Sequence, residues 1–501
     1  MTQPTLIGID IGTSSIKVVA IDFNGEVLAV INRPISLDVP CPGWSEQNPE
    51  DWWSATCVAI RQLLVNIEMP EVFGIGLSGQ MHSLVALDAN QQVLRPAILW
   101  NDVRTKVEAN SIREIVGDDA LRRFTGNPSL EGFTATKLMW MRSNEPELFD
   151  RLTHVLMPKD YIRFRLTDEI ASDPSDASGT LLFDVAQSCW SDEMLLSLAI
   201  DSELLPTIVE SSEIVGSVTR QAADQTGLKE GIPVITGGAD NAMAAVGGGV
   251  HSPGGLLISL GTSGTVVAPT KSAEADPEMR IHVMRHVIPD TWYLMGVVLS
   301  AGAALDWWRQ ISGCDDFDQL VREAGPAKAG SGGVTFLPYI TGERTPHADA
   351  NARGVFFGIH SGTERAHMTR AVMEGVSFAL NDSLQLIKNF EVNISEAIAV
   401  GGGANSSLWL QMLSDVMNLP LRTLVPSEGA PLGAAMLASV GTGIFDNVSD
   451  VAGAWLTNFS IVTPEVSLQQ AYDDTYGRYR SLYPALEKIF SDQTFHATSS
   501  R

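Results

Sequence analysis

Asp240 has the residue type and the sequence surroundings of a general base. It follows the apolar run of residues 232–235, which predicts a buried strand, and the pair Gly237 and Gly238, which permits a tight turn. Residues 242–246 favour a helix, so we expect Asp240 at a strand-to-helix corner. The alternative is a plain helix cap, because a carboxylate at a helix start commonly accepts a hydrogen bond from a backbone amide. The corner alone does not decide between these two roles.

A Gly-Thr-Ser turn occurs twice in the chain, and turns of this kind can bind phosphate. Residues 9–18 read IDIGTSSIKV and residues 258–267 read ISLGTSGTVV, so the two segments align without a gap. Backbone amides, hydroxyls and, in the first copy, Lys17 are available there to an anion, although a plain hairpin with polar turn residues would look the same. A repeat at this distance predicts two duplicated domains, each beginning with a strand, the turn and a second strand. After the first copy, Asn24-Gly25 indicates a hairpin into a third strand at residues 27–30, which predicts an antiparallel meander. Residues 48–67 predict a helix, with Asn48 as its N-cap and Pro49 as its first residue.

The two copies differ at a position that matters for metal binding. Asp10 in the first copy corresponds to Ser259 in the second. A carboxylate can hold a hydrated Mg²⁺ ion beside phosphate groups. The sequence therefore predicts a magnesium ligand at Asp10, and no carboxylate ligand at the equivalent place in the second copy.

Other glycine-rich segments also connect strands to helices. Residues 398–400 predict a strand that runs into Gly401-Gly-Gly-Ala-Asn405 and a helix, and residues 300–308 predict a helix with a close-approach glycine at Gly302. Such turns let a phosphate or a flat ring approach the backbone. The sequence contains no GxxxxGK[ST] motif, and no GxGxxG follows the first strand. These absences exclude a P-loop and disfavour a dinucleotide-binding fold.

Two polar segments could line a site for a hydroxylated ligand. Residues 78–82 follow a predicted strand and place His82 at a loop tip, although a lone histidine is more often structural. Residues 98–104 predict a strand that runs into polar residues. We also expect residues 173–179 to form a loop, and the flexible composition of Gly247-Gly-Gly249 with Ser252-Pro-Gly-Gly255 to mark the boundary between the two halves.

The composition is that of a multidomain globular protein. At 501 residues the chain is long enough for roughly two to four domains, with 45% apolar and 18% charged residues. No apolar run is long enough to span a bilayer, and the N-terminus lacks the basic region of a secretory signal, so we expect a cytoplasmic protein without a membrane partner. The formal net charge of −26 disfavours nucleic-acid binding. The four cysteines form no CxxC pair, which argues against a zinc ribbon or a disulfide framework.

Taken in order, the motifs resemble those of the FGGY family of carbohydrate kinases, within the actin-like ATPase superfamily. The resemblance covers nearly the whole chain and departs from the usual family pattern at Ala239, where a third glycine is common, and at Asn405, where a basic residue is common. The segments that carry it are IGIDIGTSSIK at 7–17, WSEQNPEDWW at 44–53, SGQMH at 78–82, WNDVR at 100–104, GGADNA at 237–242, LGTSG at 260–264, GERTPH at 342–347 and GGGAN at 401–405.

The resemblance implies an α/β fold of two ribonuclease-H-like domains, each a mixed sheet flanked by helices, with an interdomain cleft. Residues 1–249 would form an N-terminal sugar-binding domain and residues 250–501 a C-terminal nucleotide-binding domain. The cofactors would be ATP and Mg²⁺. By carry-over of the motifs, Asp240 would be the catalytic base, assisted by Asp10 through magnesium.

The same carry-over assigns the binding residues. The sugar would contact Met81, His82 and Asn241, and we add Asp102, which lies in the polar end of residues 98–104. The first turn and its lysine would contact the transferred phosphate, and a separate set of residues would line the nucleotide site. These residues are Thr13, Ser14 and Lys17 for the phosphate, and Gly261, Thr262, Gly302, Gly402, Gly403 and Asn405 for the nucleotide.

The expected reaction is ATP-dependent phosphorylation of D-xylulose to D-xylulose 5-phosphate by in-line phosphoryl transfer. The Gln80-Met81-His82 loop favours this substrate, because an uncharged sugar needs hydrogen bonds rather than the cation that a gluconate carboxylate attracts. Family members that act on ribulose, gluconate, fuculose or glycerol would share the fold, so the fold does not choose among them. A further alternative is an actin-like or chaperone-like ATPase, which we disfavour because no long C-terminal peptide-binding module remains. The sequence does not decide between a monomer and a homodimer.

Overall fold

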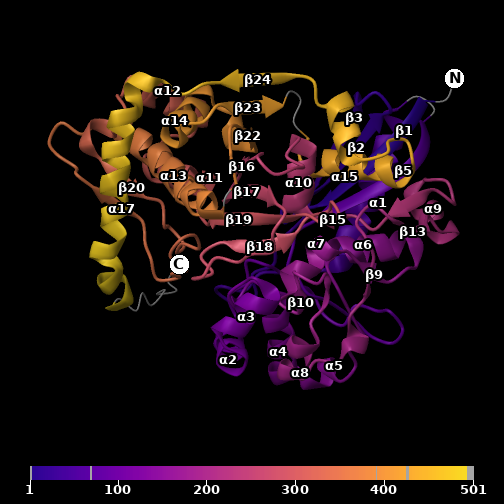
Figure 1. The fold of residues 1–501 in the computed structure, drawn as a ribbon. Helices are drawn as coiled ribbons and strands as arrows, with labels where there is room; N and C mark the ends of the chain where they lie inside the picture. The colour runs from indigo at the N-terminus through magenta and orange to yellow at the C-terminus, as the bar shows by residue number, and fades with distance from the viewer. Residues whose placement is uncertain (1–2, 68–69, 391, 425–427, 493–501) are drawn as a thin grey trace. The chain divides into compact units, whose positions relative to one another are not determined.

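The computed structural model describes residues 3–67, 70–390, 392–424 and 428–492 (Figure 1). The chain forms two compact units. Unit 1 contains residues 1–252, 269–293 and 428–457, and unit 2 contains residues 253–268, 294–427 and 458–501. Among the described residues, no helix combines the length and the apolar character that a membrane span requires. The predicted domain boundary at 249/250, with sugar binding on one side and nucleotide binding on the other, stays a prediction.

Unit 1 is built on a mixed sheet whose strand order is β13-β14-β5-β1-β2-β3, with β15 also pairing with β5. The predicted antiparallel meander is present as β1, β2 and β3, and β5 lies parallel to β1 on its other side. The strands are β1 (Gln3–Ile11), β2 (Ser15–Asp22), β3 (Val27–Pro34), β5 (Pro70–Gly79), β13 (Ile214–Ser217), β14 (Pro233–Ile235) and β15 (Gly238–Ala239).

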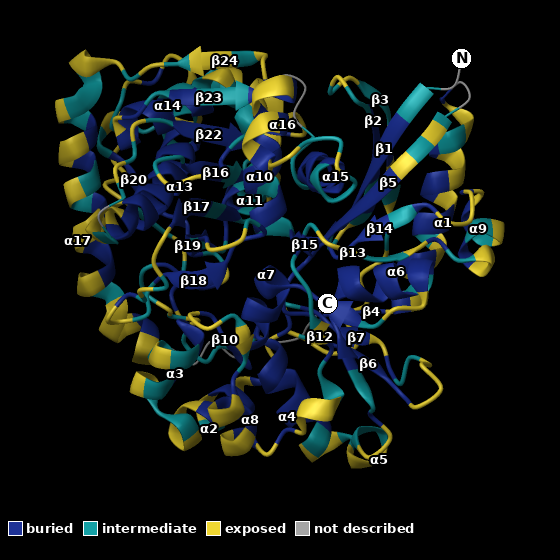
Figure 2. Cartoon of the chain, turned by 45° about the vertical axis from the view of Figure 1, so that its right-hand side comes forward, coloured by how far each residue is buried: buried dark blue, intermediate teal, exposed yellow. Residues whose placement is uncertain are grey.

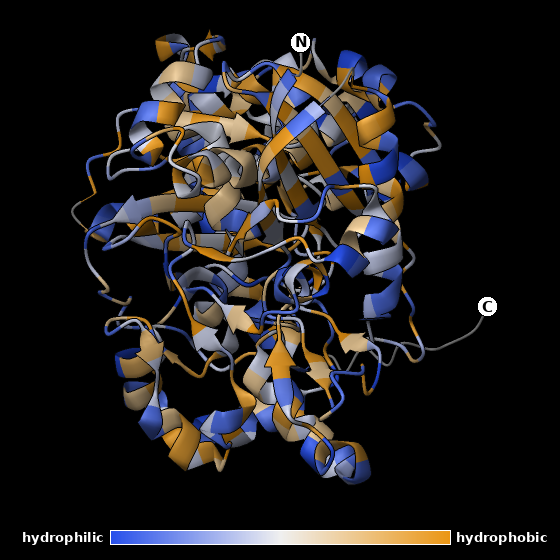
Figure 3. Ribbon diagram, turned by 90° about the vertical axis from the view of Figure 1, so that its right-hand side faces the viewer, coloured by the Kyte–Doolittle hydropathy of each residue, from blue (hydrophilic) through white to orange (hydrophobic). Residues whose placement is uncertain are grey.

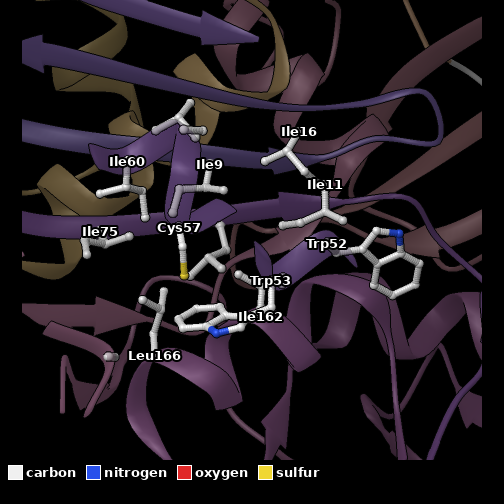
Figure 4. Packing of buried hydrophobic residues seen from close by; sticks show 14 of the residues in the cluster. Ile9, Ile11, Ile16, Trp52, Trp53, Cys57, Ile60, Ile75, Ile162 and Leu166 are labelled. Atoms are coloured by element: carbon white, nitrogen blue, oxygen red, sulfur yellow. The ribbon is translucent and has the colours of Figure 1, made fainter. Parts of the chain in front are cut away.

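One face of this sheet packs on helices α1 (Pro49–Val65) and α6 (Pro158–Thr167). Side chains alternate along a strand, so Ile7, Ile9 and Ile11 of β1 share this face and join Trp52 and other residues of the two helices in one core (Figure 4). The predicted start of α1 is confirmed, because Asn48 is the N-cap and its side chain accepts a hydrogen bond from the Glu50 amide. In Figure 3 the strands near the N-terminus are mainly orange, as expected for a sheet covered by helices.

The other face of the sheet is covered by α15 (Ala430–Gly441), which also packs against α10 (Asp240–Gly248). Glycines make this approach possible. A Cβ atom added at Gly8 would lie 1.9 Å from the Pro431 carbonyl oxygen, and one added at Gly433 would lie 2.0 Å from the Met243 carbonyl oxygen. Asp10 alternates with Ile9 and Ile11, so it lies on the α15 face of the sheet.

Unit 2 repeats the strand pattern of unit 1, as the duplicated turn predicts. Its sheet has the order β19-β17-β16-β22-β23-β24. β16 is antiparallel to β17 and parallel to β22, just as β1 is antiparallel to β2 and parallel to β5. The elements of unit 2 include β16 (Leu257–Leu260), β17 (Gly264–Thr270), β19 (Trp292–Val298), β22 (Ala397–Val400), β23 (Leu421–Leu424), β24 (Phe459–Val462), α11 (Gly302–Ile311), α12 (Phe317–Ala324), α13 (Arg365–Ile387), α14 (Ser407–Met417) and α17 (Gln469–Asp492).

Shorter elements complete both units. In unit 1 they are β4 (Glu46–Gln47), β6 (Val85–Leu87), β7 (Ala97–Ile98), β8 (His154–Leu156), β9 (Ala171–Ser172), β10 (Phe183–Asp184), β11 (Cys189–Trp190), β12 (Thr207–Ile208), β18 (His282–Arg285), α2 (Lys106–Val116), α3 (Asp118–Thr125), α4 (Thr134–Asn144), α5 (Pro146–Phe149), α7 (Pro174–Ala177), α8 (Asp192–Leu198), α9 (Arg220–Thr226) and α16 (Val448–Trp455). In unit 2 they are β20 (Thr335–Leu337) and β21 (Val355–Phe357).

Two expectations about connecting segments are wrong. Residues 173–179 are not a loop, because Asp173 caps the short helix α7 and a 3₁₀ turn, Ser178–Thr180, follows. This segment is buried, and Figure 2 shows α7 in dark blue. Gly247 and Gly248 are not a flexible boundary, because they form the last turn of α10. A Cβ atom at Gly247 would lie 2.1 Å from the Gly429 carbonyl oxygen, so this glycine serves close helix packing.

Candidate active site

Asp240 lies at a strand-to-helix corner, as predicted. β14 ends at Ile235, Gly237 takes a left-handed φ of 80°, and β15 pairs with the end of β5 before α10 begins. Asp240 is not the N-cap of α10, because Ala239 is the N-cap and Asp240 is the first helical residue, and the role of Asp240 as a base stays a prediction. The carboxylate accepts a hydrogen bond of 2.8 Å from the Asn241 side-chain amide.

The environment of Asp240 gives it a pKa suited to proton transfer at neutral pH. Burial raises the pKa to about 7, and the nearby charge of Asp10 adds to the rise. The residue keeps part of its surface accessible, so a substrate hydroxyl can reach it. A base with a pKa near the working pH is the most efficient kind.

Asp10 is the second-last residue of β1 and belongs to the same unit as Asp240. Its Oδ1 accepts a hydrogen bond of 2.9 Å from the Ser78 hydroxyl. Burial raises the pKa of Asp10, although Ser78 and Lys17 act in the opposite direction. The effect of burial therefore outweighs the stabilisation of the ionised carboxylate by Ser78 and Lys17, and a bound cation would favour the ionised form.

The first Gly-Thr-Ser turn is held rigid by buried side chains. The Thr13 hydroxyl donates to Gln80 Oε1 (3.1 Å) and accepts from the Trp100 indole (2.9 Å). Gln47 Nε2 donates to the Thr13 carbonyl oxygen at 2.7 Å and Gln80 donates to Gln47 Oε1 at 3.3 Å. Gln47 and Trp100 lie in the motifs WSEQNPEDWW and WNDVR, but the sequence did not predict a function for either residue. No local pattern in the sequence distinguishes Gln47 from the polar residues around it.

Ser14 and Lys17 lie at and just beyond this turn. Ser14 is exposed, so its hydroxyl and amide are open to a ligand. The Lys17 ammonium, which we expected to contact phosphate, lies 2.6 Å from a carboxylate oxygen of Glu428. A phosphate at the turn would have to compete with this carboxylate for the lysine. The role of Lys17 stays a prediction.

Met81 and Asn241 come together beside Asp240. The Met81 sulfur lies 3.8 Å from Asn241 Nδ2 and 3.8 Å from the hydroxyl of Tyr293, a residue that the sequence gave no reason to select. His82 is not at an exposed loop tip, because only 7% of it is accessible. Its Nδ1 lies 2.6 Å from the Gly179 carbonyl oxygen, so the predicted sugar loop contacts the 3₁₀ turn that follows α7.

Asp102 is buried in an ion pair rather than presented freely to a ligand. Both of its carboxylate oxygens accept hydrogen bonds from Arg104, and Oδ2 also accepts one of 2.6 Å from the Ser45 amide. The Arg104 guanidinium stacks 3.6 Å from the centre of the Trp44 ring. This arrangement favours a role in shaping the wall of the site, and a direct sugar contact from Asp102 stays a prediction.

In unit 2 the predicted nucleotide residues converge on the second Gly-Thr-Ser turn. The Gly302 amide donates to the Gly261 carbonyl oxygen at 2.8 Å, and the amides of Ala301 and Ala303 donate to the Thr262 carbonyl oxygen. A Cβ atom at Gly302 would lie 2.6 Å from the Gly261 oxygen, so only glycine allows the start of α11 to approach this closely.

The glycines after β22 meet the same place in unit 2. A Cβ atom at Gly403 would lie 2.9 Å from that of Leu260, the residue before the turn. Around Gly402 there is open space, and both Gly402 and Asn405 are exposed. The three glycine-rich segments therefore present accessible backbone next to one another, which is suited to binding phosphate or a flat ring.

Known proteins with a similar sequence or structure point to one family. The model of the "FGGY family of carbohydrate kinases, N-terminal domain" matches residues 5–247, and that of the C-terminal domain matches residues 256–442. The chain is 39% identical over 481 residues to a xylulose kinase of Bacillus subtilis (strain 168), covering 95% of this chain and 96% of that protein.

Two solved structures show the same fold. One is a xyloylose kinase from Brucella ovis, with 39% identity, a TM-score of 0.91, and coverage of 97% of this chain and 100% of the other. The second is a gluconate kinase from Lactobacillus acidophilus, with 26% identity, a TM-score of 0.92, and coverage of 98% and 99%. The predicted fold, two mixed-sheet domains flanked by helices, is confirmed. The gluconate kinase also shows that this fold does not by itself select a sugar.

Proposed function

The chain belongs to the FGGY family of carbohydrate kinases, and from this premise we propose that it transfers the γ-phosphoryl group of ATP to D-xylulose, which yields D-xylulose 5-phosphate and ADP. The observation that carries the proposal is the corner at Asp240, where a partly accessible carboxylate with a pKa of about 7 lies beside the Met81 loop. The near full-length similarity to a protein named xylulose kinase supports the choice of sugar.

In the proposed mechanism Asp240 is the base. Its carboxylate accepts the proton of the sugar hydroxyl while the hydroxyl oxygen forms a bond to the γ-phosphorus and the bond between this phosphorus and the β–γ bridging oxygen breaks. Asn241 donates to the Asp240 carboxylate and so keeps it oriented. Positioning of the sugar oxygen in line with the phosphorus supplies much of the rate. We propose Met81 and His82 as the side chains that orient the sugar.

Asp10 fits the role of a magnesium ligand. Carboxylate oxygens are what Mg²⁺ prefers, and Asp10 keeps part of its surface accessible. Among the described residues no group of three or more His, Cys, Asp or Glu side chains could hold a metal. One carboxylate together with the phosphates of ATP is the usual way to bind this ion. When bound, Mg²⁺ would neutralise charge on the transferring phosphoryl group.

We place the nucleotide on unit 2, at the turn of Gly261 and Thr262 with Gly302, Gly402 and Gly403. Their convergence and exposure support this placement. We propose that Thr13 and Ser14 of unit 1 contact the transferred phosphoryl group. The net charge of −26 supports the proposal that nucleic acid is not a partner. We further propose that the enzyme works in the cytoplasm, where ATP is available.

An ADP-release assay over a panel of sugars tests the proposed function. The panel contains D-xylulose, ribulose, fuculose, gluconate and glycerol, each with Mg²⁺ and ATP. We expect the highest kcat/KM for D-xylulose. A higher value for another member would replace the substrate and leave the kinase activity in place. ATP turnover that is equally fast without any sugar would instead indicate an actin-like or chaperone-like ATPase.

A further inference from the structure

A cluster of buried charges lies directly behind the corner that presents Asp240. Lys159, Asp160, Arg163, Asp173 and Asp176 all have side chains with no accessible surface. The Lys159 ammonium contacts the carboxylates of all three aspartates, and Arg163 contacts Asp160. Burying so many charges is expensive, and apolar side chains of similar volume are often at least as stabilising. Stability of the core therefore does not account for the cluster.

The cluster reaches the corner through Ser175. The Ser175 hydroxyl donates to Asp173 Oδ2 (2.5 Å) and accepts a hydrogen bond of 2.9 Å from the Ala239 amide. Ala239 is the N-cap of α10, one residue before Asp240, so this bond fixes the backbone at the point where the helix begins. A hydroxyl has a single proton, and donating it to Asp173 leaves the oxygen lone pairs directed at the amide.

Asp173 is in turn held on several sides. Its Oδ1 lies 2.9 Å from the Lys159 ammonium, and its Oδ2 accepts from the Ser175 amide and from the Ser211 hydroxyl (2.7 Å). The other end of the same turn is also tied to α6, because Arg163 Nη1 donates to the Thr236 carbonyl oxygen at 3.2 Å. Both ends of residues 236–239 are therefore anchored to one buried helix.

We propose that Lys159, Asp173 and Ser175 form a positioning device that fixes the Ala239 amide and thereby holds Asp240 in line with the sugar hydroxyl. The inference rests on the proposed role of Asp240 as the base. Ser175 acts through the backbone, so it is a positioning residue rather than a catalytic one. A misplacement of about 1 Å can cost about a hundredfold in rate, so loss of this bond should lower kcat more than it lowers binding.

The test is Ser175→Ala, and Ser178→Ala is a matched control. Both serines lie in the segment of α7 and the turn after it, with 0% and 1% of their surface accessible, and both hydroxyls accept from a backbone amide. The Ser178 hydroxyl accepts from Arg285, which is not part of the corner. We expect Ser175→Ala to lower kcat about tenfold or more with the KM values for ATP and xylulose changed less than about threefold. Ser178→Ala should lower Tm by about as much as Ser175→Ala does, but it should leave kcat unchanged.

A second readout separates positioning from general loss of stability. Hydrogen exchange of the amides in residues 236–241 should speed up in Ser175→Ala and stay unchanged in Ser178→Ala. If Ser175→Ala does not fold, Ser175→Cys tests the same bond, because a thiol has nearly the same shape but accepts hydrogen bonds weakly. Full kcat in a folded Ser175→Ala or Ser175→Cys variant would overturn the proposal, and so would an equal loss of kcat in Ser178→Ala.

The wild-type enzyme and Asp240→Asn are assayed alongside these variants. If the wild type does not phosphorylate xylulose, or if Asp240→Asn keeps its turnover, the proposed function or the proposed base fails, whatever Ser175 does. If the wild type is active, Asp240→Asn is inactive and Ser175→Ala keeps kcat, only the positioning inference fails.

Discussion

At the scale of single residues, the environment of Asp240 matters more than its identity. An aspartate in water ionises well below neutral pH, whereas burial raises the pKa of Asp240 to about 7 and the charge of Asp10 contributes in the same direction. The carboxylate is thereby a stronger base than an exposed aspartate. The hydrogen bond from the Asn241 side-chain amide orients the carboxylate, and its accessible surface lets a substrate reach it.

Asp240→Asn should remove catalysis while the fold persists. The amide has the shape of the carboxylate but cannot take the proton, and general bases contribute about 10²- to 10⁴-fold to rate. We expect kcat for xylulose phosphorylation to fall by at least about a hundredfold, with ATP still bound. Steady-state kinetics together with ATP-binding calorimetry measure both quantities. Turnover within a few-fold of the wild type would mean that the base is another group.

The same substitution should change how stability depends on pH. The folded-state pKa of Asp240 is about 7 and the ordinary value is 3.8, so the folded protein binds this proton more tightly than the unfolded chain. The free energy of unfolding of the wild type therefore falls as pH rises from about 4 to about 7. The Asp240→Asn variant has no carboxyl group at this position, so its free energy of unfolding should not show this decrease. In melting experiments without ligands, the Tm of the variant should match the wild type near pH 4 and exceed it near pH 8. A difference in Tm that does not grow with pH would contradict the raised pKa.

At the scale of elements, glycines decide how closely helices and strands approach. In unit 1, Gly8 and Gly76 of the sheet meet the backbone of α15, and Gly433 of α15 meets that of α10. Because α10 begins at Asp240 and β1 ends beside Asp10, these contacts set the spacing of the elements that carry the two carboxylates.

Gly433→Ala should destabilise unit 1 and reduce activity. Its Cβ atom would lie 2.0 Å from the Met243 carbonyl oxygen, so α10 and α15 would have to move apart. Overpacking of this kind costs about 1 to 3 kcal/mol. Gly453→Ala is the control, since Gly453 lies inside helix α16 and has open space around it. Denaturant unfolding should show a lower free energy of unfolding for Gly433→Ala. For Gly453→Ala the free energy of unfolding should rise by up to about 1 kcal/mol, because alanine has the higher helix propensity. If both substitutions change the free energy of unfolding equally, the close approach of α10 and α15 does not explain the effect of Gly433→Ala.

At the scale of the whole molecule, the two units repeat one strand pattern but carry different chemistry. Unit 1 holds Asp10 and Asp240, whereas unit 2 has Ser259 at the position of Asp10 and presents two further glycine-rich segments, those of Gly302 and Gly401–Gly403, beside its Gly-Thr-Ser turn. Duplication has thus supplied two similar scaffolds, and the side chains at the ends of the first strands distinguish them. We expect this division to be visible in which substrate a substitution affects.

Gly302→Ala should raise the KM for ATP about tenfold or more and leave the KM for xylulose nearly unchanged. The added Cβ would press within 2.6 Å of the Gly261 carbonyl oxygen and displace the turn of unit 2. Gly477→Ala in α17 of the same unit is the control, because nothing lies within 4 Å of its added Cβ atom and it should leave both KM values unchanged. Initial-rate kinetics with each substrate varied in turn make the measurement. A larger change in the KM for xylulose than for ATP would contradict the placement of ATP.

Elements with a local signal could be predicted from the residues alone. Alternation and turn residues predicted β1, β2 and β3, the cap at Asn48 predicted α1, and the aligned Gly-Thr-Ser turns predicted the repeated strand pattern. The sequence also placed Asp240 at its corner, because a strand, two glycines and a helix-forming run are contiguous in the chain. Patterns formed by contiguous residues are the ones that a single sequence predicts well.

Features that depend on residues far apart in the chain could not be predicted from the sequence. α7 has four residues, too few for a helical period to be visible, and its burial depends on Lys159 and the corner at Ala239. The pairing of Lys17 with Glu428, and the packing of Gly247 on Gly429, join segments that lie far apart in the chain. The pKa of Asp240 likewise follows from burial and from Asp10, and neither distance nor desolvation is written in a local pattern of residue types.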